Sequence, residues 1–201
     1  MAEVKILRDP GNGARGSRAT DVRPTDRAHE DQPGREKEMK ALSLQQPYAW
    51  LILQRYRADN PRRPLKALEN RSWHLPRSFA VPQRVWIHAS LTMYDVGLDE
   101  IKAELDPDQW YRCKGYLRNL YSEAMATRPG PARHALPFFG HILGSVVITG
   151  EVTHSDDPWF FGPVAFSLES PDELRRPIPY KGRHRFFDVD LSLLTVDTTR
   201  R

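Results

Sequence analysis

Residues 40–52 read KALSLQQPYAWLI, and this stretch decides the fold that we expect. Its first six residues alternate, with Leu42 and Leu44 on one side and polar or small side chains on the other, which predicts a short β-strand with one apolar face. Pro47 follows, and a proline suits the first position of a helix because the N–H that it lacks would have no partner there. The stretch therefore predicts a strand that leads directly into a helix.

The chain beyond this stretch contains further strand patterns and two more helices. Alternating or β-branched runs predict five more strands, at residues 65–73, 85–89, 142–152, 164–168 and 185–189. A capping motif at Asp106 predicts a helix up to Pro129, and a shorter helix is expected over 97–105. Residues 55–64 carry Pro61 and Pro64, so we expect a loop there. This order of elements predicts an α+β fold of about six strands and about three helices, built as a small β-barrel or a curled sheet.

The first 38 residues form a polar extension that we expect to be disordered. None of the 20 aromatic residues of the chain lies there, and eight Lys or Arg residues balance eight Asp or Glu residues. Such a segment cannot bury enough apolar surface to offset the entropy lost on ordering. We therefore expect a single folded domain over residues 39–192 and a flexible tail over 193–201, and residues 39–201 together carry the whole net charge of +4.

Several classes of protein can be set aside. No apolar run reaches the roughly 18 residues that a membrane span needs, and no stretch is typical of a signal peptide, so we expect a cytoplasmic protein without a membrane partner. Cys113 is the single cysteine, and its place on a predicted helix favours a buried structural thiol over a nucleophile. The seven histidines are not paired at metal-ligand spacing, so we expect no metal site.

A cluster of charged and aromatic residues lies at Lys66–Trp73. On a strand Glu69, Arg71 and Trp73 share a face, and Lys66 joins them if it lies in the turn that leads in. Such a cluster could hold a planar ligand, with Trp73 for stacking, Arg71 for a phosphate or carbonyl, and Glu69 to accept from a ring amine. The alternative is a surface ion pair between Glu69 and Arg71. The surrounding segment 55–84 is rich in arginine, and it could face phosphates or be a solvated loop.

These motifs, in this order, resemble the ASCH domain family, which belongs to the PUA-like β-barrel superfamily. The resemblance covers about residues 39–190, and it is carried by LSLQQPYAWLI at 42–52, Lys66-x-x-Glu69-Asn70-Arg71-Ser72-Trp73, IHAS at 87–90, PWFFGP at 158–163, Lys181-Gly182 and FFDV at 186–189. The signature of the family is Gly-x-Lys-x-x-Glu-x-Arg, and here Pro64 stands at the glycine position.

The resemblance implies a cleft beneath the helix that follows the first strand, lined by Lys66, Glu69 and Arg71. It implies a binding module for RNA, a nucleotide or a modified base. The candidate ligand-binding residues are Gln45, Gln46, Arg62, Arg63, Lys66, Glu69, Arg71, Trp73 and Trp159.

A small hydrolase is the alternative class that the resemblance implies. Some members resemble amidohydrolases of acetylated cytidine, which use the signature lysine, a hydroxyl residue at the Glu69 position and a glutamate on a later strand, where Glu151 is the match. Lys66, Glu69 and Glu151 are thus the candidate catalytic residues. Other members look like ribonucleases, and this is the one alternative that would need Mn²⁺ or Mg²⁺; no other cofactor is expected. The sequence does not decide between a binding role and a catalytic one, and it does not indicate the oligomeric state.

Overall fold

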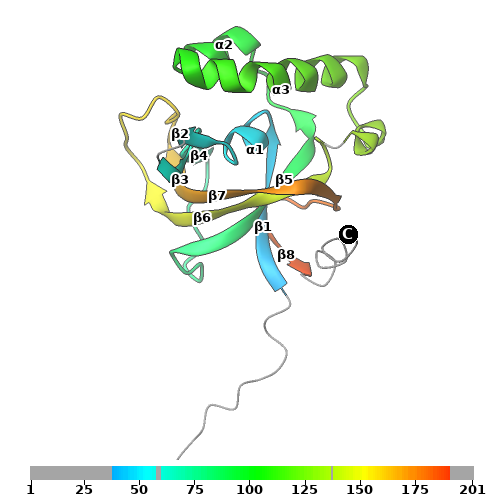
Figure 1. The fold of residues 1–201 in the computed structure, drawn as a ribbon. Helices are drawn as coiled ribbons and strands as arrows, with labels where there is room; N and C mark the ends of the chain where they lie inside the picture. The colour runs from blue at the N-terminus through cyan, green and yellow to red at the C-terminus, as the bar shows by residue number, and fades with distance from the viewer. Residues whose placement is uncertain (1–37, 58–59, 137, 191–201) are drawn as a thin grey trace, which may run out of the picture. The chain divides into compact units, whose positions relative to one another are not determined.

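The computed structural model describes residues 38–57, 60–136 and 138–190, and the expected extension and tail lie outside them except for Glu38. Figure 1 shows the ribbon of the described part. Its elements, in chain order, are β1 (Glu38–Gln46), α1 (Tyr48–Leu51), β2 (Arg55–Arg57), β3 (Asn60–Pro64), β4 (Leu68–Arg71), β5 (Gln83–Met93), α2 (Leu98–Ala103), α3 (Pro107–Ala126), the 3₁₀-helix η1 (Pro131–Ala135), β6 (His141–Val152), β7 (Val164–Pro179) and β8 (Phe186–Asp190).

Six of the strands form one mixed sheet in the order β4-β7-β6-β5-β1-β8. β1 pairs in parallel with β5 and antiparallel with β8, and the other neighbours are antiparallel. The expected α+β fold with six sheet strands and three α-helices is therefore confirmed.

The sheet is not closed into a barrel, so this part of the expectation is wrong. The outer strands β4 and β8 are not paired with each other in the described residues. Their ends meet through side chains instead, since the ring of Trp73, just after β4, lies edge-on to Phe186 of β8 with 5.6 Å between the ring centroids. Arg71 of β4 also donates a hydrogen bond to the backbone oxygen of Ser43 on β1. The result is a curled sheet whose edges are joined by side chains rather than by a hydrogen-bonded ladder.

The expected passage from strand to helix at Pro47 is confirmed. Pro47 is the N-cap of α1, which has only four residues. The side chain of Gln46 fixes this junction, because its oxygen accepts from the N–H of Trp50 and its amide donates to the carbonyl of Phe138. A short buried helix therefore follows β1, and its orientation is set by a buried glutamine.

Residues 55–64 do not form the loop that their prolines predict. β2 and β3 pair as an antiparallel ribbon, with Arg55 opposite Pro64 and Arg57 opposite Asn60. A proline is tolerated in a strand where its missing N–H is not needed by a neighbour, and a two-stranded ribbon leaves one side of each strand unpaired. Proline content therefore misled the prediction, because only a central strand excludes this residue.

Helix α3 begins with the predicted capping motif. The side chain of Asp106 accepts from the N–H of Gln109, and the side chain of Gln109 accepts from the N–H of Asp106. Its inner face packs Cys113 and Leu117 into an apolar cluster with residues of α1, α2 and β4. Burial raises the pKa of the Cys113 thiol to about 11, and the expected burial of this thiol on a helix is confirmed. No helix in the described residues is long and apolar enough to cross a membrane.

Strand β7 is far longer than the expected 164–168. Its first part is buried and pairs with both β4 and β6. Beyond Ser170, whose φ of 52° bends the strand, its side chains are mostly exposed or half-buried. An exposed edge carries no apolar alternation, which is why the periodicity predicts only the buried part.

The close packing of β6 on β7 gives a stability test at Gly144. A Cβ there would meet the backbone oxygen of Asp172 and lie 2.9 Å from a methyl group of Leu53, whereas a Cβ on Gly150 of the same strand would meet nothing within 4 Å. We expect Gly144→Ala to lower the free energy of unfolding by about 1–3 kcal/mol. Gly150→Ala should change it by less than about 1 kcal/mol. Urea denaturation of both variants checks this, and equal effects would show that the contact is not tight.

Candidate functional site

One pocket of about 510 Å³ brings five parts of the chain together. These parts are β1 with the start of α1, the segment around β4, the end of β5, the loop near residue 161 and the loop near residue 185. Gln45, Lys66, Glu69 and Arg71, all predicted from the sequence, line it. The remaining lining residues are Ser43, Leu44, Tyr48, Asn70, Ser90, Thr92, Tyr94, Phe161, Gly162, His184 and Arg185.

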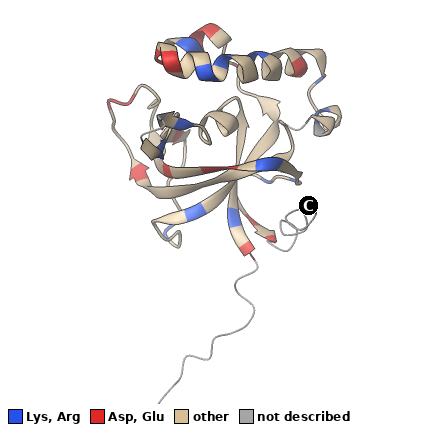
Figure 2. Ribbon diagram, in the orientation of Figure 1, with Lys and Arg blue, Asp and Glu red and all other residues tan. Residues whose placement is uncertain are grey.

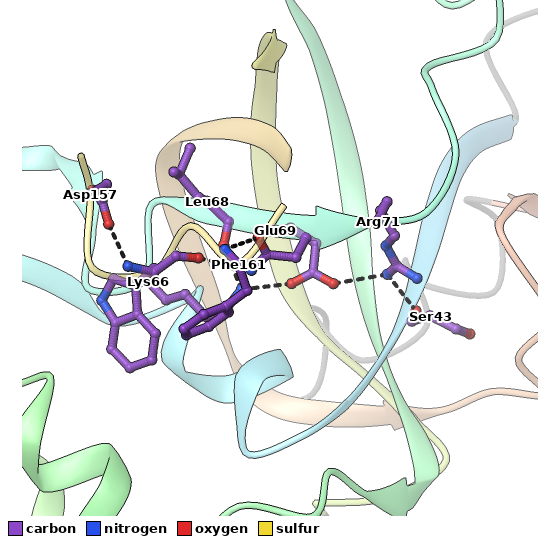
Figure 3. Close-up of polar contacts among 9 residues, drawn as sticks. Ser43, Lys66, Leu68, Glu69, Arg71, Asp157 and Phe161 are labelled. Carbon is purple, nitrogen blue, oxygen red and sulfur yellow. Dashed lines mark hydrogen bonds and ion pairs between the residues drawn. The ribbon is translucent and has the colours of Figure 1, made fainter. Parts of the chain in front are cut away.

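The Glu69 carboxylate is held between two cations. Lys66 Nζ lies 2.8 Å from one oxygen, and Arg71 Nη2 lies 3.1 Å from the other (Figure 3). Lys66 also donates to the backbone oxygen of Leu68, and Arg71 to that of Ser43. Lys66 is 1% exposed and Glu69 is 8% exposed, so this is not the surface ion pair of the alternative interpretation. Three predicted residues thus form one buried, hydrogen-bonded cluster at the pocket.

Trp73 supports this cluster from behind and does not line the pocket. Its ring packs edge-on against Phe166 and Phe186, with centroid distances of 5.1 and 5.6 Å. The guanidinium of Arg71 lies 5.7 Å from the centroid of the same ring. The predicted stacking residue therefore positions Arg71, and another side chain must offer an aromatic surface to a ligand.

Phe161 offers that surface. It is 59% exposed and lines the pocket, whereas Trp159, which was predicted, is buried in the core. Asn70 holds this loop, because its side-chain nitrogen donates to the carbonyl of Trp159 and its oxygen accepts from the N–H of Phe161, both at 2.8 Å. Asp157 adds a bond to the N–H of Trp159. Asn70, between Glu69 and Arg71 in the chain, thus fixes an exposed ring at the rim.

Tyr48 and Tyr94 form a second aromatic wall that sequence reasoning missed. Their ring centroids are 5.0 Å apart, and Lys66 Nζ lies 4.9 Å from the centroid of Tyr48. Burial, and then the neighbouring Tyr94, raise the pKa of the Tyr48 hydroxyl, so it keeps its proton at neutral pH and can donate a hydrogen bond. Tyr48 stood in the quoted motif, but only the fold shows that its ring faces Lys66.

The other predicted ligand-binding residues have different roles. Gln45 lines the pocket and donates to the hydroxyl of Thr92. Gln46 is buried and fixes the start of α1, as described above. Arg62 and Arg63 line another cavity, where Arg63 pairs with Asp157 at 3.3 Å. Neither arginine is placed to contact a ligand in the main pocket.

Glu151, the candidate for the later catalytic glutamate, is not among the residues that line the pocket. Its carboxylate accepts from the N–H of Leu75 at 2.7 Å and from Nδ1 of His74 at 2.8 Å. The Leu75 N–H, with a smaller effect of His74, holds its pKa below the usual value. Glu151 therefore fixes the segment after β4 and has no place in the pocket.

The pocket carries more positive than negative charge. Three cationic side chains, those of Lys66, Arg71 and Arg185, line it together with the single carboxylate of Glu69. Nε of Arg71 is buried without a hydrogen-bond partner among the described residues, which is costly for a donor on a charged group. Among the residues that the structure describes, no group of three or more His, Cys, Asp or Glu side chains is placed to hold a metal ion. The pocket suits a planar ligand with polar edges and negative charge.

The Glu151 contacts predict a dependence of stability on pH. Because the folded pKa lies below the unfolded one, the stabilisation is complete above about pH 5 and is lost as the pH falls through the folded pKa. Glu151→Gln should therefore lower the melting temperature at about pH 7 and have little effect at about pH 3. Glu169→Gln, a change at an exposed carboxylate of β7, is the control. Equal destabilisation by Glu151→Gln at both pH values would contradict the prediction.

Comparison of the chain with protein-family models and with curated proteins finds no match. The pocket itself therefore carries the functional conclusion.

Proposed function

We propose that the protein is a binding module for RNA or a nucleotide, and that its pocket holds one base. The observation that carries this proposal is the position of an exposed aromatic ring, Phe161, beside the buried cluster of Lys66, Glu69 and Arg71 in one pocket. A base has a flat apolar face and polar edges, so it needs both kinds of surface.

The chemistry of each group fits this use. Stacking of a base on an aromatic side chain contributes about 1–3 kcal/mol, and Phe161 is held in place by Asn70. Each oxygen of Glu69 uses one lone pair for its cation and has another with which to accept from a ring N–H. The amide of Gln45 and the hydroxyl of Ser90 add donors and acceptors at the wall. The pocket thus offers stacking and edge recognition to the same ring.

The proposal includes membership of the ASCH family and a PUA-like fold. Two features of the described residues support it. A short helix follows the first strand, as the resemblance implies, and Lys66, Glu69 and Arg71 meet in a pocket that Tyr48 of this helix also lines. A cytoplasmic location is part of the same proposal.

The hydrolase alternative stays a prediction, and the geometry gives it less support. Glu151 does not line the pocket, so the proposed pair of Lys66 and a later glutamate is not formed there. Lys66 Nζ already contacts Glu69 and the carbonyl of Leu68, which leaves it little freedom to take a proton from a substrate. Binding of a base does not require Lys66 to take up or release a proton, so the observed contacts of Lys66 are compatible with a binding role.

Removal of the aromatic ring should weaken binding. We expect Phe161→Ala to reduce affinity for a short single-stranded RNA of random sequence by about 5- to 150-fold, which corresponds to the loss of one stacked base. Tyr111→Ala, a change at an exposed ring on α3, is the matched control and should have no effect. Fluorescence anisotropy at low salt measures both. Failure of the native protein to bind RNA and nucleotides would overturn the proposal.

The two classes of function differ in turnover. Incubation with acylated nucleosides, and with RNA in the presence of Mn²⁺, should give no product from the native protein. The variant Lys66→Met, which keeps the length of the buried chain, is the control. Product formation that this variant abolishes, at a temperature well below its own unfolding transition, would replace the binding module with a hydrolase.

A further inference from the structure

The segment between β7 and β8 borders the pocket with a run of basic residues. Residues 181–185 read KGRHR. His184 and Arg185 line the main pocket, and Lys181 to His184 line a second cavity of about 420 Å³. The two cavities have Ser43, Ser90, Thr92 and His184 in common. The basic segment therefore runs along two adjoining hollows.

The positive charges of this segment are not paired with carboxylates of the described residues. Lys181, Arg183 and Arg185 are exposed, and none of them forms an ion pair with a carboxylate of the described residues. Arg63 and Lys66, which were predicted from the sequence, differ in this respect, since Arg63 pairs with Asp157 and Lys66 with Glu69. Arg62 and Arg63 line another cavity, so the unpaired charge beside the pocket lies on residues 181–185.

Arg185 has an unusual backbone conformation, and its side chain lies next to the ring of Trp73. Its φ is 59°, a left-handed conformation that costs energy for a residue other than glycine. Its guanidinium lies 5.3 Å from the centroid of the Trp73 ring, and the guanidinium of Arg71 lies 5.7 Å from the same centroid. The guanidinium groups of Arg71 and Arg185 therefore both lie near the ring of Trp73, and both arginines line the pocket.

The segment is also pressed against the sheet. A Cβ on Gly182 would meet the ring of His88 and lie 2.8 Å from Oγ of Ser43, so no larger residue fits. Nε2 of His88 donates to the carbonyl of Tyr180 at 3.0 Å, and Nδ1 shares a hydrogen bond with Ser43 Oγ at 2.9 Å. The segment is thereby positioned by β1 and β5, as a preformed binding element requires.

We propose that Arg185, together with Arg71, binds the phosphate of a nucleotide whose base occupies the pocket. Guanidinium groups bind phosphate through paired N–H donors and keep their charge at all relevant pH values. Arg183 and Lys181 extend this row of basic residues, called the track below, along the second cavity. They would bind the next phosphate of an RNA strand. This inference rests on the proposed function. It assigns the phosphate contacts to Arg185 and Arg71 instead of Arg62 and Arg63.

Calorimetry with the four common ribonucleosides and their 5′-monophosphates tests the proposal. The native protein should bind a monophosphate about ten-fold or more tightly than its nucleoside, since a charge-assisted contact is gained, and this advantage should shrink as salt rises. Arg185→Gly should bring the ratio of the two affinities, monophosphate to nucleoside, close to one. Glycine adopts the observed φ without strain, so the fold is retained, and the melting temperature verifies this. Arg62→Ala is the matched control.

The outcomes separate the two proposals. Equal affinity for nucleoside and monophosphate, or an advantage that Arg185→Gly does not reduce, overturns the phosphate site while the base pocket stands. Absence of binding to nucleosides, monophosphates and RNA overturns both. A further arm distinguishes the source of the phosphate, because Arg183→Ala should weaken binding of single-stranded RNA if the track follows a strand. It should leave RNA and monophosphate binding unchanged if the ligand is a free nucleotide.

Discussion

The curled sheet depends on the burial of one carboxylate. Glu69 lies on an edge strand and is nearly inaccessible to water, so its charge must be compensated within the protein. Lys66 compensates one oxygen and Arg71 the other, and Arg71 then reaches the carbonyl of Ser43 on β1. Removal of one partner from such a buried cluster typically costs about 3–5 kcal/mol, because the remaining charge is left without compensation. The ion cluster thus does for β4 and β1 what a ladder of backbone hydrogen bonds does in a closed barrel.

The same constraint forms the pocket. The link between β4 and β1 runs through the long side chains of Glu69 and Arg71, and the pocket lies beside them. Asn70, adjacent to Glu69 on the same strand, turns its side chain the other way and holds the loop of Phe161. Alternation along a strand therefore directs one residue of the motif to the ionic cluster and its neighbour to the aromatic rim. The spacing of the motif has a direct physical purpose.

Much of the fold follows from local sequence, but the failures have identifiable causes. The start of α1 at Pro47 and the cap of α3 at Asp106 depend on neighbouring residues, and both were predicted. The β2–β3 ribbon and the exposed part of β7 were not, since edge strands tolerate proline and show no apolar alternation. In the site, Lys66, Glu69 and Arg71 were found because they lie within one short motif. Phe161 and Arg185 were missed, because their position depends on long-range contacts.

The distribution of charge likewise depends on long-range contacts that the sequence does not reveal. A count along the sequence places the largest excess of basic over acidic residues in residues 55–84, and Figure 2 shows Lys and Arg residues spread over β1, β5, β7 and the helices. What matters for an anionic ligand is the charge that the protein leaves unpaired, and pairing joins distant residues, as Arg63 and Asp157 show. Arg84 is likewise engaged, by Ser145 and the carbonyl of Ser170. The shorter basic run at 181–185 borders the pocket and forms no ion pair with a carboxylate of the described residues, whereas Arg62 and Arg63 of the longer run line another cavity.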